Sequence, residues 1–151
     1  MARHYFDSSA LVKLYHNEPG TSVVEQIALQ AGSEIVTSRL TIVELQSAIA
    51  LKLRTGAIRP AEAKVLQERI EGDLADGELR VVAVTGDHFG QAEQFVKQLG
   101  ASHGLRTLDS IQLAVAADLW RNGLIDSFVV ADKVLAAVAA LQSLSVIEPC
   151  P

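Results

Sequence analysis

Short apolar, β-branched runs that alternate with longer segments of helical periodicity are the feature that most constrains the fold of this 151-residue chain. The runs predict strands at 3–6, 34–38, 79–84, 127–131 and 145–147. The apolar spacing between them predicts helices at 8–15, 21–31, 40–54, 61–74, 87–99, 108–120 and 133–144. Strands separated by helices need crossover connections, which are typical of parallel sheets. We therefore predict an α/β fold with a mostly parallel sheet of four or five strands, flanked by helices on both faces.

Glycine and proline residues mark the expected ends of several helices. Gly32, Gly56 and Gly100 follow helical segments, where glycine accepts the left-handed backbone of a C-cap. Residues 102–104 are expected to form a loop. Pro60 suits the first turn of the helix that follows it.

The composition is that of one compact domain spanning residues 1–151. With 49% hydrophobic residues, 21% charged residues and no linker-like stretch, the chain can bury a sizeable core. No apolar stretch reaches the roughly 18 residues of a membrane span, and no signal-peptide region is present, so we expect a cytoplasmic protein. Cys150 is the only cysteine, which excludes an intramolecular disulfide and a thiolate metal cluster. The net charge of −5 argues against a broadly basic surface for nucleic acid.

Acidic residues recur where predicted strands end and predicted helices begin. Asp7 closes the first strand, Asp109 and Asp132 open later helices, and Glu44 lies within a helix. The carboxyl ends of parallel strands share one edge of a sheet, which is where open α/β sheets bind ligands. A second interpretation stays open for the three aspartates, because Asp is also a favoured N-cap that stabilises a helix by about 1 kcal/mol. Gln112 follows Asp109 at a loose capping-box spacing.

Glu44 has no capping explanation. Positions 40, 44, 48 and 51 share one stripe of the predicted helix, and the other three positions are apolar. A carboxylate buried there needs a positive partner, which a metal ion, Arg39 or Arg106 could supply. The alternative is that Glu44 lies on a solvated edge of the helix.

Four carboxylates without a His or Cys cluster favour a hard cation, Mg²⁺ or Mn²⁺, over zinc. Such ions activate water and stabilise the leaving oxygen in phosphodiester hydrolysis. Competing enzyme classes fail on spacing, because the chain has no G-x-x-x-x-G-K-[ST], G-x-G-x-x-G, H-E-x-x-H or G-x-S-x-G motif. The histidines are scattered, and we interpret His88 and His103 as surface residues.

Four sequence segments, which contain the four acids in order, together resemble the PIN-domain ribonucleases of the VapC toxin type. They are residues 5–15, 41–45, 105–114 and 128–135. The resemblance spans nearly the whole chain and implies a PIN-like fold with Mg²⁺- or Mn²⁺-dependent endoribonuclease activity. The residues that it implies are both metal-binding and catalytic are Asp7, Glu44, Asp109 and Asp132. It also implies a homodimeric toxin of a type II toxin–antitoxin system, neutralised by a small antitoxin protein.

The resemblance further implies supporting roles near the acids. Ser8 or Ser9 corresponds to a polar neighbour that assists the placement of metal or substrate. Two positions depart from the family pattern, because Val130 stands where Thr is frequent and Gln112 stands where His is common. Neither departure replaces a carboxylate, so activity is still expected.

Positive side chains near the acids are candidates for contacts with RNA phosphates. Lys13, Arg39 and Arg106 each lie close in sequence to an acid, whereas Lys52 and Arg54 favour a solvated helix end that complements the helix dipole. Aromatic residues make up only 5% of the chain, which favours a structured RNA, such as tRNA or rRNA, over base stacking on a single strand. The alternative is a non-catalytic PIN-fold module that acts through a protein partner and uses its acids only as helix caps.

Overall fold

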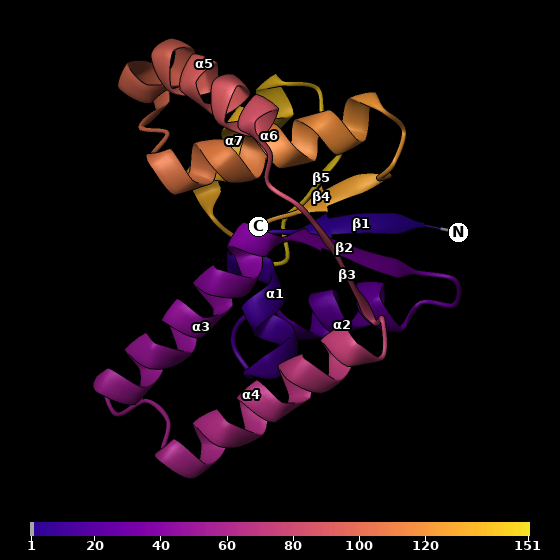
Figure 1. The fold of residues 1–151 in the computed structure, drawn as a ribbon, viewed down its shortest axis with the longest axis vertical. Helices are drawn as coiled ribbons and strands as arrows, with labels where there is room; N and C mark the ends of the chain where they lie inside the picture. Colours follow the sequence, from indigo (N-terminus) through magenta and orange to yellow (C-terminus); the bar gives the residue numbers. More distant parts are fainter. Residues whose placement is uncertain (1) are drawn as a thin grey trace.

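Five parallel strands form one sheet in the order β3-β2-β1-β4-β5 in this computed structural model, which describes residues 2–151 (Figure 1). The strands are β1 (Arg3–Phe6), β2 (Glu34–Ser38), β3 (Leu79–Val82), β4 (Ser127–Val129) and β5 (Val146–Ile147). Each neighbouring pair is parallel. The predicted α/β class and the five-stranded sheet are therefore confirmed.

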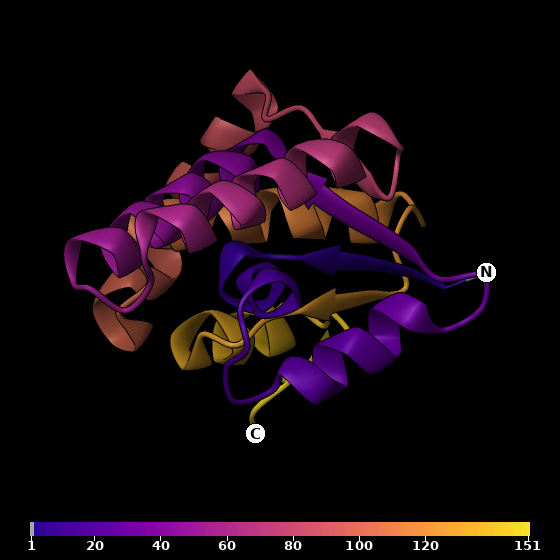
Figure 2. The same cartoon turned by 90° about the horizontal axis from the view of Figure 1, so that it is seen from below.

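Helices cover both faces of this sheet. They are α1 (Ser8–Tyr15), α2 (Thr21–Leu29), α3 (Arg39–Arg54), α4 (Pro60–Ala75), α5 (Gly86–His103), α6 (Thr107–Arg121) and α7 (Lys133–Leu141). Helices α1 to α4 lie on one face and α5 to α7 on the other (Figure 1). The long helices α3 and α4 run side by side, as the view from below also shows (Figure 2). None of the helices in residues 2–151 is long and apolar enough to cross a membrane.

The two faces of the sheet bury two separate apolar clusters, because successive strand residues point to opposite sides. Tyr5 and Phe6 are both fully buried, but Tyr5 packs in the cluster beneath α5, α6 and α7, and Phe6 in the cluster beneath α1, α3 and α4. Phe128 and Val129 repeat this division on β4. Burial on both faces explains why β1 and β4 each contain two consecutive apolar residues where a strand with one solvated face would alternate.

The central position of β1 brings the ends of three strands together. β2 and β4 flank β1, and all three run in the same direction. Asp7, Ser38 and the residues after Val129 therefore lie at the same, carboxyl edge of the sheet. The chain builds β2 and β3 on one side of β1 and then crosses over to build β4 on the other. A topological switch point, where ligands of open α/β sheets bind, thus lies between β1 and β4.

Helix α5 is longer than the sequence predicts. It continues through Gly100 to His103, so the C-cap expected at Gly100 and most of the loop expected at 102–104 are wrong. The cap is Gly104, whose φ of 70° lies in the left-handed region. At Gly100 an added Cβ would lie 3.3 Å from the Val96 Cγ1 atom, so glycine at this position fits close packing inside a helix.

Other element ends differ by a few residues. α2 ends at Leu29 and α7 at Leu141, earlier than the predicted residues 31 and 144. Gly32 therefore belongs to the turn before β2 and is not the C-cap, which is Gln30. The end of α3 is as predicted, because Gly56 follows it with a φ of 74°.

Candidate active site

Asp7 lies at the junction between β1 and α1 and is only 3% exposed. It is the N-cap of α1, since its Oδ1 accepts a hydrogen bond of 3.1 Å from the Ala10 backbone N–H. The Ser9 hydroxyl also donates to this carboxylate, with Oγ at 2.7 and 2.8 Å from the two carboxylate oxygens. The capping interpretation of Asp7 is therefore confirmed. Asp7 also lies at the switch point of the sheet.

Ser9 links Asp7 to the junction that follows β4. Its Oγ accepts hydrogen bonds from the backbone N–H groups of Ala131, at 3.0 Å, and Asp132, at 3.1 Å. A serine hydroxyl has one proton to donate and two lone pairs, and these contacts use all of them. Ser9 thus holds two acids at fixed positions across the switch point. Ser8 is half-buried, and it opposes a small part of the rise that burial causes in the pKa of Glu44.

Glu44 is half-buried on α3 and is bonded to a neutral partner. The Gln112 Nε2 atom donates to Glu44 Oε1 at 2.6 Å. The predicted partner Arg106 instead lies with its Nε 3.5 Å from Asp109 Oδ2, and Arg39 is exposed. Glu44 is therefore only partly solvated, and its negative charge has no cationic side chain within ion-pair distance in the part of the chain that the structure describes.

Asp109 and Asp132 differ in their relation to the helices. Asp132 is the N-cap of α7, accepting a 2.8 Å hydrogen bond from the Leu135 backbone N–H, as predicted. Asp109 lies in the first turn of α6, and Arg106 occupies the N-cap position. The capping interpretation of Asp109 is therefore wrong. Its carboxylate therefore does not cap a helix, whereas those of Asp7 and Asp132 do.

The four acids influence one another electrostatically, which places them around a shared region. The pKa of Asp7 is raised to about 7, mainly by burial; the hydrogen bonds from Ser9 and Ala10 oppose this rise, and the charges of Glu44 and Asp132 add to it. Burial also raises the pKa of Glu44 and of Asp109. Asp109 adds to the rise in the pKa of Glu44, and Asp132 adds to the rise in the pKa of Asp109. Because ionised carboxylates repel one another, the full ionisation of this cluster is unfavourable.

This donor set fits a hard divalent cation. It is made of carboxylate oxygens, which Mg²⁺ and Mn²⁺ prefer, and its like charges lack compensation except for the exposed Arg106. Within residues 2–151, no three His, Cys, Asp or Glu side chains converge closely enough to enclose an ion. The acids therefore surround a common region of the sheet edge without forming a closed cage.

The positive residues near the acids fall into two groups. Lys13 turns toward Glu18, with a Nζ to Oε1 distance of 3.9 Å, and Lys52 pairs with the same glutamate at 3.5 Å. Lys52 lies in the last turn of α3 as expected but is half-buried and paired with Glu18, while Arg54 is exposed as expected. Arg106 is 79% exposed beside Asp109.

His88 is buried, contrary to its interpretation as a surface residue. It is 7% exposed, and its Nδ1 accepts a 3.0 Å hydrogen bond from the Thr85 backbone N–H, completing a capping box at the start of α5. Nε2 therefore carries the proton and donates to Asp118 Oδ2 at 2.8 Å. Thr85 and His88 have the spacing of a capping box, so this contact could have been predicted from the sequence. His103 is exposed, as predicted.

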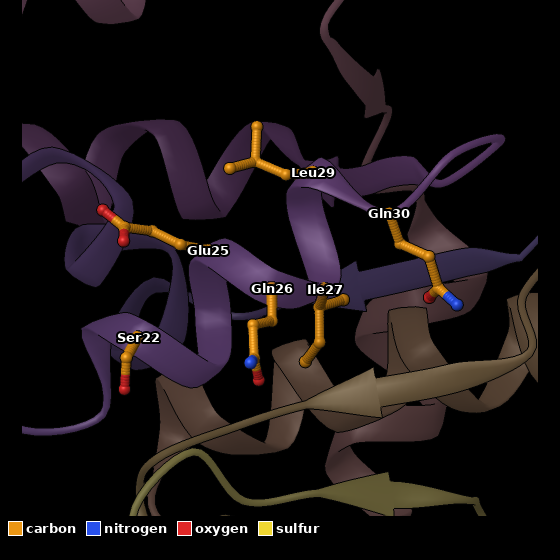
Figure 3. A pocket seen from close by; sticks show the side chains of 6 residues that line it. All are labelled: Ser22, Glu25, Gln26, Ile27, Leu29 and Gln30. Carbon is orange, nitrogen blue, oxygen red and sulfur yellow. The ribbon is translucent and has the colours of Figure 1, made fainter.

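Three polar residues beneath the acids were not identified as supports from the sequence. Tyr5, Thr41 and Gln112 are all buried and hydrogen bonded to one another. Gln112 stands out in the sequence only as a departure from the family pattern and as a polar residue in the apolar segment 111–117. A separate hollow on the outer face of α2, which includes Ser22 and Leu29, contains none of the four acids (Figure 3).

Comparisons with known proteins agree with this architecture. The family model described as PIN domain matches residues 4–141. Ribonuclease VapC45 of Mycobacterium tuberculosis (strain CDC 1551 / Oshkosh) is 31% identical over 131 residues, which cover 80% of this chain and 79% of that protein. A toxin–antitoxin complex from Klebsiella pneumoniae is similar in structure, with a TM-score of 0.63, 18% identity and 97% coverage of both chains. Mycobacterium tuberculosis VapC20, described as a sarcin-ricin loop cleaving toxin, has a TM-score of 0.62 and 18% identity, covering 89% of this chain and 94% of its own.

Proposed function

Because this chain belongs to the PIN domain family, we propose that it is a divalent-metal-dependent endoribonuclease and the toxin of a toxin–antitoxin pair. The observation that carries the proposal is the cluster of four mutually influencing carboxylates at the switch point of the sheet. A relative at 31% identity is named a ribonuclease, which supports RNA as the substrate.

In the proposed mechanism, Asp7, Glu44, Asp109 and Asp132 hold Mg²⁺ or Mn²⁺ and form the catalytic centre. When bound, such an ion polarises the phosphodiester and supplies an activated water for in-line attack. The protein's own part is orientation: Ser9 fixes Asp7 and the loop at Asp132. Since the pKa of Asp7 is about 7, a cation must compete with a proton there at neutral pH.

The substrate proposed is a structured RNA, such as a tRNA or an rRNA. The chain has few aromatic residues and a net charge of −5, so binding relies on a local set of cations and on the metal. Arg39 and Arg106 are exposed near the acids and are the proposed phosphate contacts, whereas Lys13 is engaged with Glu18. The similar structure described as a sarcin-ricin loop cleaving toxin supports a structured target.

The partner proposed is a small antitoxin protein, and the active form proposed is a homodimer in the cytoplasm. The similarity to a toxin–antitoxin complex supports the antitoxin. A short neighbouring reading frame for a DNA-binding protein would identify it, and light scattering of the purified chain measures the dimer.

Substitution of Asp7 tests the nuclease directly. The purified chain and an Asp7→Asn variant are incubated with total cellular RNA and Mg²⁺ or Mn²⁺, with EDTA as the metal-free arm. Loss of a direct ligand is expected to slow cleavage by about 100-fold or more, since even supporting partners cost about 10- to 100-fold. Asp76→Asn, an exposed carboxylate after α4, serves as the matched control. Equal cleavage by the wild type and Asp7→Asn would refute the assignment.

A non-catalytic binding module is the second candidate, favoured by one specific observation. Asp7 and Asp132 both cap helices, so both have a structural use without metal. Isothermal titration with Mn²⁺ separates the two functions. If the wild type binds Mn²⁺ and Asp109→Asn, which caps no helix, does not, the result supports the nuclease. If the wild type does not bind Mn²⁺ at millimolar concentrations, the result supports the binding module.

A further inference from the structure

Beneath the acids, three buried hydroxyl and amide groups form a network that we call the brace, consisting of Tyr5, Thr41 and Gln112. The Tyr5 hydroxyl donates to Gln112 Oε1 at 2.5 Å. Gln112 Nε2 donates to Thr41 Oγ1 at 2.9 Å and to Glu44 Oε1 at 2.6 Å. The brace residues come from β1, α3 and α6, so it joins both faces of the sheet. Tyr5 and Thr41 are 0% exposed and Gln112 is 1% exposed, so water does not compete for these contacts.

The orientation of the Gln112 amide is fixed by its partners. An ionised carboxylate only accepts hydrogen bonds, so the nitrogen of the amide must face Glu44. The Tyr5 hydroxyl donates to the amide oxygen of Gln112, which fixes the other side of the amide. Thr41 accepts from Nε2 and lies 3.3 Å from Oε1. Both hydrogens of the amide are therefore engaged, its oxygen accepts from Tyr5, and a flipped amide would lose the contact to Glu44.

The brace residues stand at short, regular distances from three of the acids. Tyr5 is two residues before Asp7, Thr41 is three before Glu44, and Gln112 is three after Asp109. In a helix, three residues is close to one turn, so Thr41 and Gln112 lie on the same faces as Glu44 and Asp109. A displacement within the brace is thus transmitted to the acids through rigid backbone.

We propose that Gln112 is a positioning residue that, through the brace, sets the side chain of Glu44 and the spacing between α3 and α6 for cation binding. This inference rests on the proposed function. Gln112 contributes a hydrogen bond without a charge, so it orients Glu44 while leaving its negative charge for a cation. An arginine or a protonated histidine at this position would neutralise that charge.

Gln112→Met is the test variant, because methionine is unbranched and similar in length but lacks the amide. The readouts are the Mn²⁺ dissociation constant from isothermal titration, and kcat and KM for RNA cleavage. Loss of an oriented ligand partner is expected to weaken Mn²⁺ binding and lower kcat by about 10- to 100-fold. KM for RNA is expected to change by less than about twofold, since the brace is buried beneath the site.

A matched control separates positioning from general destabilisation. Ile70→Val removes one methyl group from a fully buried residue of α4 in the cluster on the other face of the sheet from α6. Its Mn²⁺ affinity is expected to equal that of the wild type at a temperature where both are folded. Tyr5→Phe removes one brace hydroxyl and keeps the ring, and its affinity is expected to fall by about 3- to 10-fold.

The outcomes distinguish this inference from the proposed function. Weaker Mn²⁺ binding in Gln112→Met and in Tyr5→Phe, but not in Ile70→Val, supports the positioning role. If Gln112→Met does not fold, Tyr5→Phe decides. A wild type that binds Mn²⁺ and cleaves RNA, with brace variants of equal affinity, overturns the positioning role alone. A wild type that neither binds Mn²⁺ nor cleaves RNA overturns the proposed function and this inference with it.

Discussion

At the scale of the residue, Asp7 combines two requirements that oppose each other. It caps α1 and accepts the Ser9 hydroxyl, and both contacts favour the ionised form. Burial and the neighbouring carboxylates oppose ionisation more strongly, and the pKa of Asp7 rises from 3.8 to about 7. The folded chain without metal therefore becomes less stable as Asp7 loses its proton. A residue that weakens the empty fold in this way is typical of a binding site.

The sign of this effect gives a prediction for the metal-free protein in EDTA. Between about pH 4 and 7 the folded state holds a proton on Asp7 that the unfolded state has lost, so stability falls as pH rises through this range. Asp7→Asn removes the titrating group and is expected to be more stable than the wild type by about 4 kcal/mol at about pH 8, with the difference fading below about pH 4. Urea denaturation at several pH values measures it. A constant difference across pH would contradict the assigned cause.

Ser9 gives a second prediction at this scale. Ser9→Ala leaves the N–H groups of Ala131 and Asp132 without their acceptor, which is expected to cost about 1–3 kcal/mol of unfolding free energy. Cleavage is expected to slow by about 10-fold or more, because two acids lose their link. Denaturation and RNA cleavage are measured together. Ser22→Ala on the exposed face of α2 is the control, and a Ser9→Ala variant as stable as this control would rule out the link (Figure 3).

The site residues differ in whether the sequence near each of them is enough to predict its position in the fold. Asp7 and Asp132 follow strands directly, so their places at the sheet edge can be predicted from the sequence once the strands are identified. The contact between Gln112 and Glu44 joins residues 68 apart, and that between Tyr5 and Gln112 joins residues 107 apart. No local pattern encodes which of several buried polar groups will meet after folding. The pairing of Lys13 with Glu18 was missed because it depends on the turn between α1 and α2.

At the scale of the element, periodicity predicts the centres of helices better than their ends. The cores of α3, α4 and α6 lie where the apolar spacing places them. Ends depend on single capping contacts that several candidate residues can provide. For α5 the C-cap is Gly104 and not Gly100, and the Gly104 backbone N–H donates to the Gly100 carbonyl. The N-cap of the same helix involves His88, a residue type that a capping pattern rarely includes.

Gly104, which caps α5, and Gly90, which lies inside α5, give a paired prediction. Gly104 has a left-handed φ of 70°, so Gly104→Ala is expected to destabilise the protein by about 1 kcal/mol through backbone strain alone. Gly90 is exposed and helical, and a Cβ added there would meet open space, so Gly90→Ala is expected to stabilise by about 0.5–1 kcal/mol. Thermal denaturation of both variants checks the pair. If both substitutions change the stability by the same amount in the same direction, Gly104 is not the C-cap of α5.

At the scale of the whole molecule, the fold gathers carboxylates whose like charges the proposed cation would compensate. An ion that binds the folded chain but not the unfolded chain stabilises it by mass action. At about 100 times its dissociation constant, Mn²⁺ is expected to add about 2.7 kcal/mol and to raise Tm by roughly 5–10 °C. Differential scanning fluorimetry with and without EDTA measures this shift. Asp109→Asn, which caps no helix, should lose most of it, and an undiminished shift in that variant would place the ion elsewhere.

The crossover from β3 to β4 also sets when activity can arise during synthesis. β4 lies beside β1 in the middle of the sheet, and the Ser9 hydroxyl reaches Asp7 and Asp132 only after that strand has docked. A ribosome must therefore translate past residue 132 before the last carboxylate can join the other three. For the proposed nuclease, the nascent chain would therefore stay inactive until β4 has docked beside β1.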